Sequence, residues 1–299
     1  MAFVNPFRLP GRWFRGNTHT HTTVSDGRIP LPERVQAYRE AGYDFLVLTD
    51  HRAVTDVSSY CDSDFLAIPG SELHPANPYG GDLYHLVALN IDSPIETEGM
   101  HPNEVIAAVH AQGGQVVIGH PYWCGHTLTD LLPLEGCFAV EVFNATCGWI
   151  GKEDSEPHWD ALLDRKGQLF GIAADDCHAV KEDSFRGWVM VKSEALTRES
   201  IMDALVRGAY YSTTGPTISD LVVTPAADGG RKGTKVTVRC PGARRITFKA
   251  QHNFGSSIFA PKGELLESAD YVLNGNEKFV RVEVIDPQGC KAWTNPIFF

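Results

Sequence analysis

The chain has 299 residues, 43% of them hydrophobic, and a formal net charge of −11 at pH 7. This length and composition predict a soluble globular protein with one large domain and one small domain. The acidic balance argues against a general surface for nucleic acid or anionic membranes, because such partners need basic patches. A small phosphorylated substrate stays possible, since bound cations would dominate the local field.

The cysteines and the start of the chain indicate a cellular location. The seven cysteines are odd in number and lack Cys-x-x-Cys spacing, which is typical of free thiols in a reducing compartment. Residues 1–11 contain Pro6, Arg8 and Pro10 and lack a continuous apolar run, so they predict neither a signal peptide nor a membrane anchor. Apolar runs everywhere stay well below the roughly 20 residues that span a bilayer. We therefore expect a cytoplasmic protein without a membrane partner.

Strands and helices are expected to alternate over most of the chain. Strands are predicted at 13–22, 45–48, 64–68, 83–90, 115–118, 138–143, 168–173 and 188–191, and helices at 31–41, 103–112, 159–166 and 197–208. Thr197 is a candidate N-cap of the last helix. Such alternation implies a mostly parallel sheet, and about seven strands of this kind would close into a barrel. Catalytic groups of such a barrel lie on loops at the carboxyl ends of its strands.

The sequence pattern changes from Ser219 onward. Short alternating strands, separated by Gly, Pro, Asn and Asp turns, are predicted at 221–223, 235–238, 245–249, 271–273, 279–285 and 292–298. This pattern is typical of a small antiparallel β-sandwich. We therefore divide the chain into a barrel over residues 1–217 and a β-domain over residues 218–299, and expect the β-domain to serve packing or oligomerisation rather than chemistry.

The stretch of residues 16–27 begins a candidate metal site. His19 and His21 are one residue apart at the end of the first strand, so their imidazoles project from the same side. Asp26 follows in a Ser-Asp-Gly turn, and two imidazoles with a carboxylate suit zinc, manganese or iron. Further residues of metal-binding type recur where later apolar runs end: Asp50, His51, Glu72, His85, His120, Glu141, Asn144, Asp176 and His178. The position of His85 stays open, because it lies near the beginning of the predicted strand 83–90. This recurrence favours a metal centre over an ordinary polar surface.

Five short motifs in order resemble the PHP (polymerase and histidinol phosphatase) family of metallohydrolases over about residues 13–215. They are His-x-His after the first strand, Thr-Asp-His after the second, a Gly-Ser-Glu, a Gly-His-Pro and a late Asp-x-His. The start of the chain, the segment 211–216 and the β-domain are similar to the carbaryl-hydrolase-like branch of that family. The resemblance implies a distorted, TIM-like (β/α)7 barrel with two or three divalent cations, which would be zinc, manganese or iron.

The resemblance also implies which residues hold the metals. One metal would be bound by His19, His21, Glu72 and Asp176; Glu72 would bridge to a second metal, completed by His85 and His120; and a third would be bound by Asp26, His51 and His178. Many family members carry a histidine where this chain has Asp26, which leaves the occupancy and identity of the third metal open.

Hydrolysis follows from such a centre without a nucleophilic side chain. A carboxylate bridging two cations about 3.5–4 Å apart leaves room for a shared hydroxide, whose pKa the metals lower. The hydroxide would attack phosphorus or a carbonyl carbon while a neighbouring metal takes up the developing charge. The candidate catalytic residues are Glu72, Asp50 and His178. The sequence has neither a Gly-x-Ser-x-Gly elbow nor a P-loop, which argues against covalent hydrolases and nucleoside triphosphatases.

Other residues are candidates for supporting roles. Asp50 either orients His51, as metal-bound histidines usually have a carboxylate or carbonyl partner, or caps the following turn. Glu141 and Asn144 are expected to line the site rather than bind metal. Two further histidines lie near the ligands in sequence and merit mutation: His74 and His126.

Four residues are candidates for contact with the substrate. Tyr122 and Trp123 follow His120 and could wall a pocket for an aromatic or sugar ring, with simple packing as the alternative. Arg186 and Lys181 lie in the loop after His178 and could contact a phosphate, with solvated loop residues as the alternative.

The favoured activity is that of a phosphoesterase acting on a small phosphomonoester or nucleotide. It is the commonest activity of the family that the chain resembles, and a trinuclear centre can bind three phosphate oxygens. Hydrolysis of a carboxylic or carbamic ester is the alternative, favoured by the closer branch likeness and by the lack of an arginine cluster near the motifs. A non-catalytic metal- or carbohydrate-binding protein is a third possibility, weakened by the complete ligand set. The expected partner is a small, phosphorylated molecule, and the oligomeric state stays open.

Overall fold

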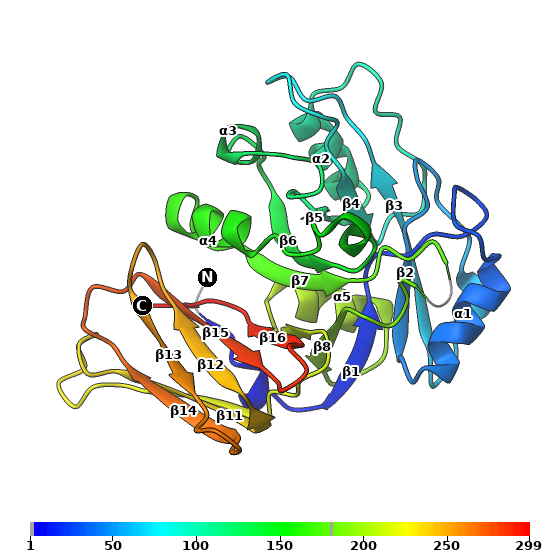
Figure 1. Cartoon of the computed structure of the whole chain (residues 1–299). Helices are drawn as coiled ribbons and strands as arrows, with labels where there is room; N and C mark the ends of the chain where they lie inside the picture. Colours follow the sequence, from blue (N-terminus) through cyan, green and yellow to red (C-terminus); the bar gives the residue numbers. More distant parts are fainter. Residues whose placement is uncertain (1–2, 180–181) are drawn as a thin grey trace.

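The computed structural model describes residues 3–179 and 182–299, and it folds the first part of the chain around a curved sheet (Figure 1). The strands of this part are β1 (Arg12–Asn17), β2 (Phe45–Leu48), β3 (Leu66–Leu73), β4 (Leu86–Leu89), β5 (Gln115–Ile118), β6 (Cys137–Asn144), β7 (Phe170–Ala174), β8 (Trp188–Ser193) and β9 (Tyr210–Thr213). The helices are α1 (Leu31–Glu40), α2 (Pro102–Ala111), α3 (Leu128–Leu131), α4 (Glu156–Arg165) and α5 (Arg198–Val206), with short 3-10 turns η1 (Pro6–Arg8), η2 (Ser58–Tyr60) and η3 (Thr146–Ile150).

Strands β1 to β7 are neighbours in the sheet in chain order. The pairs β1–β2, β2–β3, β5–β6 and β6–β7 are parallel, as predicted, whereas β4 runs antiparallel to both β3 and β5. The prediction of parallel strands is therefore wrong for β4. Because β4 is reversed, its amino end lies at the same edge of the sheet as the carboxyl ends of its neighbours.

The alternation of strands and helices is less regular than the sequence predicted. The connection from β2 to β3 contains only the turn η2, and residues 74–85 join β3 to β4 as a loop. The observed fold is a mixed α/β fold with a large sheet and few helices. The sheet nevertheless curls until the segments beyond β1 and β7 meet, where His21 N donates to Cys177 O at 3.1 Å and Asp176 N donates to His19 O at 2.8 Å.

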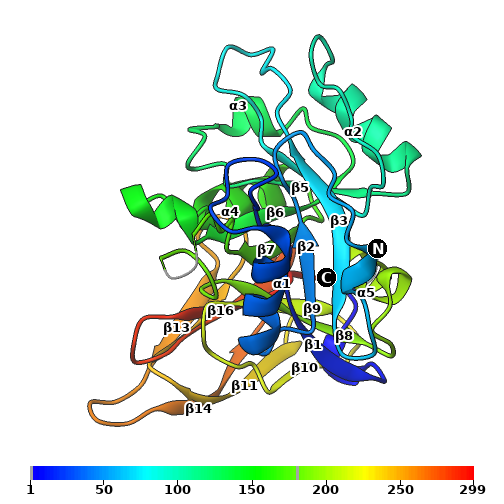
Figure 2. The same ribbon diagram turned by 90° about the vertical axis from the view of Figure 1, so that its right-hand side faces the viewer.

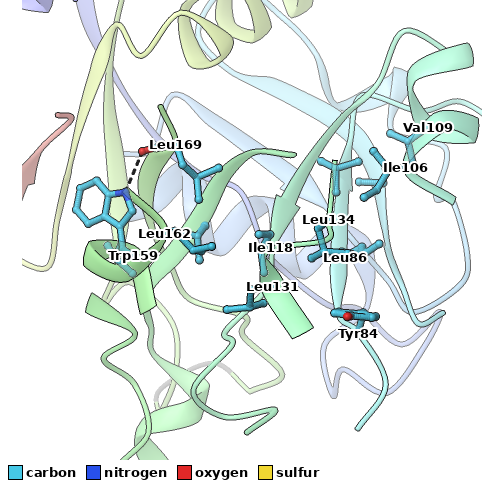
Figure 3. Packing of buried hydrophobic residues seen from close by; sticks show 14 of the residues in the cluster. Tyr84, Leu86, Ile106, Val109, Ile118, Leu131, Leu134, Trp159, Leu162 and Leu169 are labelled. Carbon is cyan, nitrogen blue, oxygen red and sulfur yellow. Dashed lines mark hydrogen bonds between the residues drawn. The ribbon is translucent and has the colours of Figure 1, made fainter. Parts of the chain in front are cut away.

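The helices cover the sheet through the apolar faces that their sequences predicted. Val105, Ile106 and Val109 of α2 are almost completely buried in the same cluster as Trp159 of α4. Figure 3 labels Ile106, Val109 and Trp159 in this cluster. Trp159 Nε1 donates to the carbonyl of Leu169 at 2.9 Å, so its one polar atom is satisfied in the core. In the described part of the chain, no helix has the length and apolar character that crossing a membrane requires.

Helix α1 lies over β2, which Figure 2 shows from the side. Val35 and Tyr38 of α1 share a buried apolar cluster with Leu46 and Leu48 of β2. Two prolines and one glycine bound this helix: Pro30 precedes it, Pro32 lies in its first turn, and a left-handed Gly42 comes just after its end. This packing fixes the loop before α1, which carries Asp26.

The rest of the chain is antiparallel, as predicted. Its strands are β10 (Asp220–Thr224), β11 (Lys235–Ala243), β12 (Arg245–Lys249), β13 (Gly255–Phe259), β14 (Leu266–Val272), β15 (Phe279–Ile285), β16 (Lys291–Thr294) and β17 (Ile297–Phe298). Strands β10, β11 and β14 form a separate sheet, which shares a buried apolar core with β12 and β15. Strand β16 pairs with β9, so the large sheet continues into this region (Figure 1). The boundary at residues 217 and 218 stays our proposal.

At the outer edge of β7, backbone N–H and C=O groups form hydrogen bonds with side chains rather than with a neighbouring strand. Ser212 of β9 is fully buried; its Oγ accepts from Ala173 N at 3.2 Å and donates to Gly171 O at 2.8 Å. We predict that Ser212→Ala lowers the free energy of unfolding by about 1–3 kcal/mol, because it leaves both backbone groups buried without a partner. Chemical denaturation measures the loss. The exposed Ser257→Ala is the control, with an expected change within about 0.5 kcal/mol, and equal effects of the two variants would contradict this role.

Candidate metal centre

The predicted ligands meet at one edge of the curved sheet. His19, His21 and Asp26 follow β1, His51 follows β2, Glu72 lies in β3, His85 precedes β4, His120 follows β5, and Asp176 and His178 follow β7. Most of them line a cavity of about 240 Å³, together with Trp123, Thr146 and Cys147. His85 reaches this edge because β4 is antiparallel, which answers the question that the sequence left open.

The first predicted ligand set forms a buried cluster. His19, His21, Glu72 and Asp176 each offer one ligand atom, and these atoms lie within 4.8 Å of one another. The Nε2 atoms of His19 and His21 are 3.1 Å apart, and Asp176 Oδ1 lies 3.3 Å from the first and 2.9 Å from the second. Among the described residues, Glu72 Oε2 and Asp176 Oδ1 are buried without a hydrogen-bond partner. Buried polar atoms normally have partners, so this donor set fits a divalent cation.

The second predicted set lies on the other oxygen of the same glutamate. Glu72 Oε1 is 2.6 Å from His85 Nδ1 and 3.2 Å from His120 Nε2. Cys124 Sγ lies 3.5 Å from His120 Nδ1, on the side of the ring away from Glu72. Glu72 therefore stands between the two sets with one oxygen directed to each, which is the position that a bridging carboxylate needs.

The third predicted set lies at the mouth of the cavity. Asp26 Oδ2 is 3.3 Å from His51 Nε2, and Asp26 Oδ1 is 3.3 Å from His178 Nε2. His21 joins these residues in a group whose ligand atoms lie within 4.8 Å of one another. Asp26 is about half exposed, so this set is the most open to solvent of the three.

Charge in the cluster is balanced between imidazoles and carboxylates. Burial raises the pKa of Glu72, but the nearby His19 and a hydrogen bond from His120 outweigh burial and hold that pKa well below its ordinary value. Burial lowers the pKa of His19, yet the carboxylates of Asp176, Glu141 and Glu72 raise it well above its ordinary value. Protons on the histidines and a bound cation therefore compete for the same carboxylates.

Glu141 orients two proposed metal ligands, His19 and His120, through hydrogen bonds. Its Oε1 lies 2.7 Å from His19 Nδ1, which leaves His19 Nε2 directed at the cluster, and its Oε2 accepts from His120 N at 3.0 Å and Asn144 Nδ2 at 2.8 Å. Asn144 Nδ2 also donates to Asp176 Oδ2 at 3.1 Å. Both residues thus support the ligands rather than face the cavity.

We predict that Glu141→Gln weakens metal binding by about 10–100-fold, as loss of a ligand's supporting partner typically does. Glutamine has a single acceptor oxygen, so either His19 or the backbone of His120 loses its acceptor. Competition with a chromophoric chelator measures the affinity. The matched control is Glu135→Gln, an exposed glutamate just before β6, and a loss of affinity equal to that of this control would contradict the supporting role.

Asp50 faces away from His51. Its Oδ1 accepts from Thr22 N at 2.7 Å and from Ser25 Oγ at 2.9 Å, and its Oδ2 accepts from Thr55 Oγ1 at 2.9 Å. These bonds hold the turn that leads into Asp26, and one of them caps the loop after His51. We therefore propose a positioning role for Asp50 in place of the predicted catalytic role.

The candidate substrate contacts do not lie together in one cavity. Trp123 lines the metal cavity, with its ring centroid 5.3 Å from that of His120. Tyr122 instead lies against His158, at 5.9 Å between ring centroids. Arg186 is exposed and lines a neighbouring cavity of about 550 Å³, separated from the metal cavity by η3. Lys181 lies outside the described residues.

Two residues that the sequence motifs did not single out, Arg34 and Asp175, hold the ligand loops in place. Arg34 of α1 is buried; its Nε donates to His21 O at 3.0 Å and its Nη2 to Cys177 O at 3.3 Å, so it ties the loop after β1 to the loop after β7. Asp175 accepts from Tyr38 Oη at 2.6 Å and from the backbone of the loop after His178. Arg34 and Tyr38 are four residues apart on α1, a spacing that could have revealed a polar anchor on its inner face.

Comparisons with known proteins bear on the fold. The sequence matches no family model and no curated protein. Among solved structures, it is similar to a two-domain protein from Bacteroides vulgatus that contains a predicted PHP-like metal-dependent phosphoesterase, with 15% identity, a TM-score of 0.55 and 99% of each chain covered. It also matches a proposed metal-dependent phosphoesterase from Bifidobacterium adolescentis, with 16% identity, a TM-score of 0.46 and coverage of 64% of this chain and 96% of that one. An amidohydrolase from Chromobacterium violaceum matches with 18% identity, a TM-score of 0.44 and coverage of 56% of this chain and 89% of that one. The Bacteroides match spans nearly the whole of both chains. It therefore indicates that this chain has the fold of a two-domain protein with a PHP-like region.

Proposed function

We propose that the chain is a metal-dependent phosphoesterase of the PHP family, with a distorted seven-stranded barrel formed by β1 to β7. The observation that carries this proposal is the position of Glu72, which directs Oε1 to His85 and His120 and Oε2 to His19 and His21. We further propose two or three divalent cations, of zinc, manganese or iron, a small phosphorylated substrate and a cytoplasmic location.

The residues of this site would hold cations and orient a substrate. Bound divalent cations supply an activated water and neutralise charge that develops on the substrate. Glu72 is held ionised by its histidine neighbours, so it can bridge two cations without a preceding proton loss. His178 and Asp26 lie at the cavity mouth, where an entering substrate meets them first.

One observation favours the carboxylic or carbamic ester hydrolase as a second candidate. The metal cavity has neither lysine nor arginine among the described residues that line it, and Trp123 and Cys147 give it apolar walls. A phosphate dianion would therefore depend on the cations alone for charge compensation, whereas a neutral ester would not need further cationic groups. Arg186, in the neighbouring cavity, is the described basic residue nearest in sequence to the ligands of β7.

The test combines metal analysis with two substrates. Protein purified without chelators is analysed for its elements, and hydrolysis of p-nitrophenyl phosphate and of p-nitrophenyl acetate is measured with and without added manganese. We expect two or three metals per chain and metal-dependent release of phosphate. Cleavage of the acetate alone would favour the ester hydrolase, and a protein without stoichiometric metal would overturn the proposal.

A further inference from the structure

His74 belongs to the cluster although the family motifs give it no role. It follows β3 two residues after Glu72, while the intervening Leu73 is buried in the apolar core, as the alternation of a strand requires. The His74 ring is buried, with its centroid 4.7 Å from that of His51 and 4.4 Å from that of His85. The imidazole is thus packed among proposed ligands.

Two buried atoms without hydrogen-bond partners lie beside His74. Among the described residues, neither Glu72 Oε2 nor His51 Nδ1 makes a well-aligned hydrogen bond, although the two atoms are 2.9 Å apart. His74 Nε2 lies 3.8 Å from Glu72 Oε2, which is too long for a hydrogen bond. His51, Glu72 and His74 each offer one ligand atom, and these atoms lie within 4.8 Å of one another. Metal–ligand bonds of about 2.0–2.2 Å separate two ligand atoms by roughly 3–3.6 Å, so this spacing suits a shared cation.

His51 can serve only one cation at a time. Its Nε2 lies 3.3 Å from Asp26 Oδ2, while its Nδ1 is directed at Glu72. A neutral imidazole has one nitrogen with a free lone pair and one with a proton. If Nε2 binds a cation beside Asp26, the proton is on Nδ1 and faces Glu72. If Nδ1 binds a cation, the proton is on Nε2 and faces Asp26.

We propose that the third cation has two mutually exclusive positions, chosen by the tautomer of His51. In the outer position it is held by His51 Nε2 with His21, Asp26 and His178; in the inner position it is held by His51 Nδ1, Glu72 Oε2 and His74 Nε2. His74 is then a metal ligand of the inner position. This inference rests on the metal centre of the proposed function.

The test compares zinc binding in the full chain and in three variants: Asp26→Ala, His74→Ala and the double variant. Zinc equivalents are counted by elemental analysis, and the affinity of the weakest ion is measured by chelator competition. We expect each single variant to keep that ion, because the other position stays available, with binding weakened by no more than about tenfold, the lower limit for loss of a supporting contact. The double variant should lose one equivalent. The control is His126→Ala. His126 is buried but lies near the carbonyl oxygen of Asp82 rather than in the cluster, so its loss should alter zinc binding neither in the wild type nor in Asp26→Ala.

Three results would overturn the inference: Asp26→Ala alone loses the third ion, the double variant binds as much zinc as Asp26→Ala, or the wild type and all three variants bind only two ions. A wild type without stoichiometric metal would instead overturn the proposed function. Nitrogen-15 spectra of zinc-loaded, histidine-labelled protein give a second measurement on folded wild type and Asp26→Ala. Coordination of His51 should move from Nε2 toward Nδ1 when Asp26 is removed, and an unchanged His51 signal contradicts the tautomer choice.

Discussion

The variant Glu72→Gln is expected to reduce the rate of hydrolysis by about 10²–10³-fold, the loss typical of removing one electrostatic group from an active site. Glu72 is buried and places one oxygen near His85 and His120 and the other near His19 and His21. The amide of glutamine carries no charge and offers one acceptor oxygen instead of two. The variant can therefore serve one of the two metal sets but cannot bridge them.

The fold should survive this substitution. Glutamine has nearly the same shape as glutamate, and the apolar residues of β3, such as Ile68 and Leu73, keep their packing. Steady-state kinetics on the better p-nitrophenyl substrate, with metal content measured on the same sample, checks the prediction. Retained turnover in a folded Glu72→Gln variant would contradict a mechanism in which Glu72 serves both metal sets.

Glu277→Gln is the matched control. Glu277 is also buried, but it accepts from Tyr271 Oη at 2.8 Å and from the backbone of Asn274 at 2.9 Å, in the β-domain. We expect this variant to lose some stability and to keep its metal content and kcat/KM. The pair of variants therefore separates the charge of Glu72 from the general cost of altering a buried glutamate.

Elements with a strong local signal could be predicted from the sequence. The apolar runs of β2, β5, β12 and β15 have the predicted bounds, and α5 begins after Thr197, whose side chain accepts from Ser200 N. Strand β13 was missed because its Gly-Ser-Ser start has little strand preference and most of it is exposed. Its strand conformation depends on pairing with β12, a contact that local sequence does not record.

Strand direction was the main error in the fold. The apolar run of β4 has the same pattern in either direction, so periodicity cannot decide between parallel and antiparallel pairing. The consequence for the site concerns His85, whose position near the start of its predicted strand left its place at the metal edge of the sheet uncertain. The reversal of β4 puts it 2.6 Å from Glu72.

The candidate site likewise contains residues that the sequence could reveal and residues that it could not. Residues in short motifs at strand ends, such as His19, His21 and Asp176, could be found because the ends of neighbouring strands share one edge of the sheet. Arg34 was missed because its contacts join segments distant in sequence, and its spacing from Tyr38 is the local signal that was overlooked. His74 was singled out only for its nearness to the ligands in sequence, because the role proposed for it depends on the orientation of its ring. For Asp50, the sequence placed the carboxylate beside His51, but the direction of its side chain is set by the hydroxyls of the Thr22–Ser25 turn.

The largest loss of stability is expected for Arg281→Met. Arg281 of β15 is fully buried; its Nε lies 2.6 Å from Asp160 Oδ1 and its Nη2 lies 3.1 Å from Glu156 Oε2, both on α4. The guanidinium carbon also lies 4.5 Å from the centroid of Trp159. Removing one partner of a buried ion pair leaves the other charge uncompensated, at a cost of about 3–5 kcal/mol.

Two features place the expected loss near the lower limit, at about 3 kcal/mol. Glu156 keeps Lys249 at 2.6 Å and Lys291 at 2.9 Å, and Asp160 is partly exposed, so water can solvate the remaining carboxylates. Methionine fills much of the volume of the arginine stem, so the loss reports on charge and hydrogen bonds more than on a cavity. Denaturant midpoints and slopes measure the change.

Lys278→Met is the matched control, because the chain repeats the same contact one helical turn further along α4. Lys278 also comes from the β-domain and lies 3.3 Å from Asp164, but its side chain is 58% exposed. Exposed pairs contribute less than about 1 kcal/mol, since water screens the charges and the side chain loses freedom when it is held. We expect the two variants to differ by about 2 kcal/mol or more. Their metal content should be equal, because neither residue is among those that line the metal cavity. Equal destabilisation would show that burial of Arg281 does not decide how α4 is held to the β-domain.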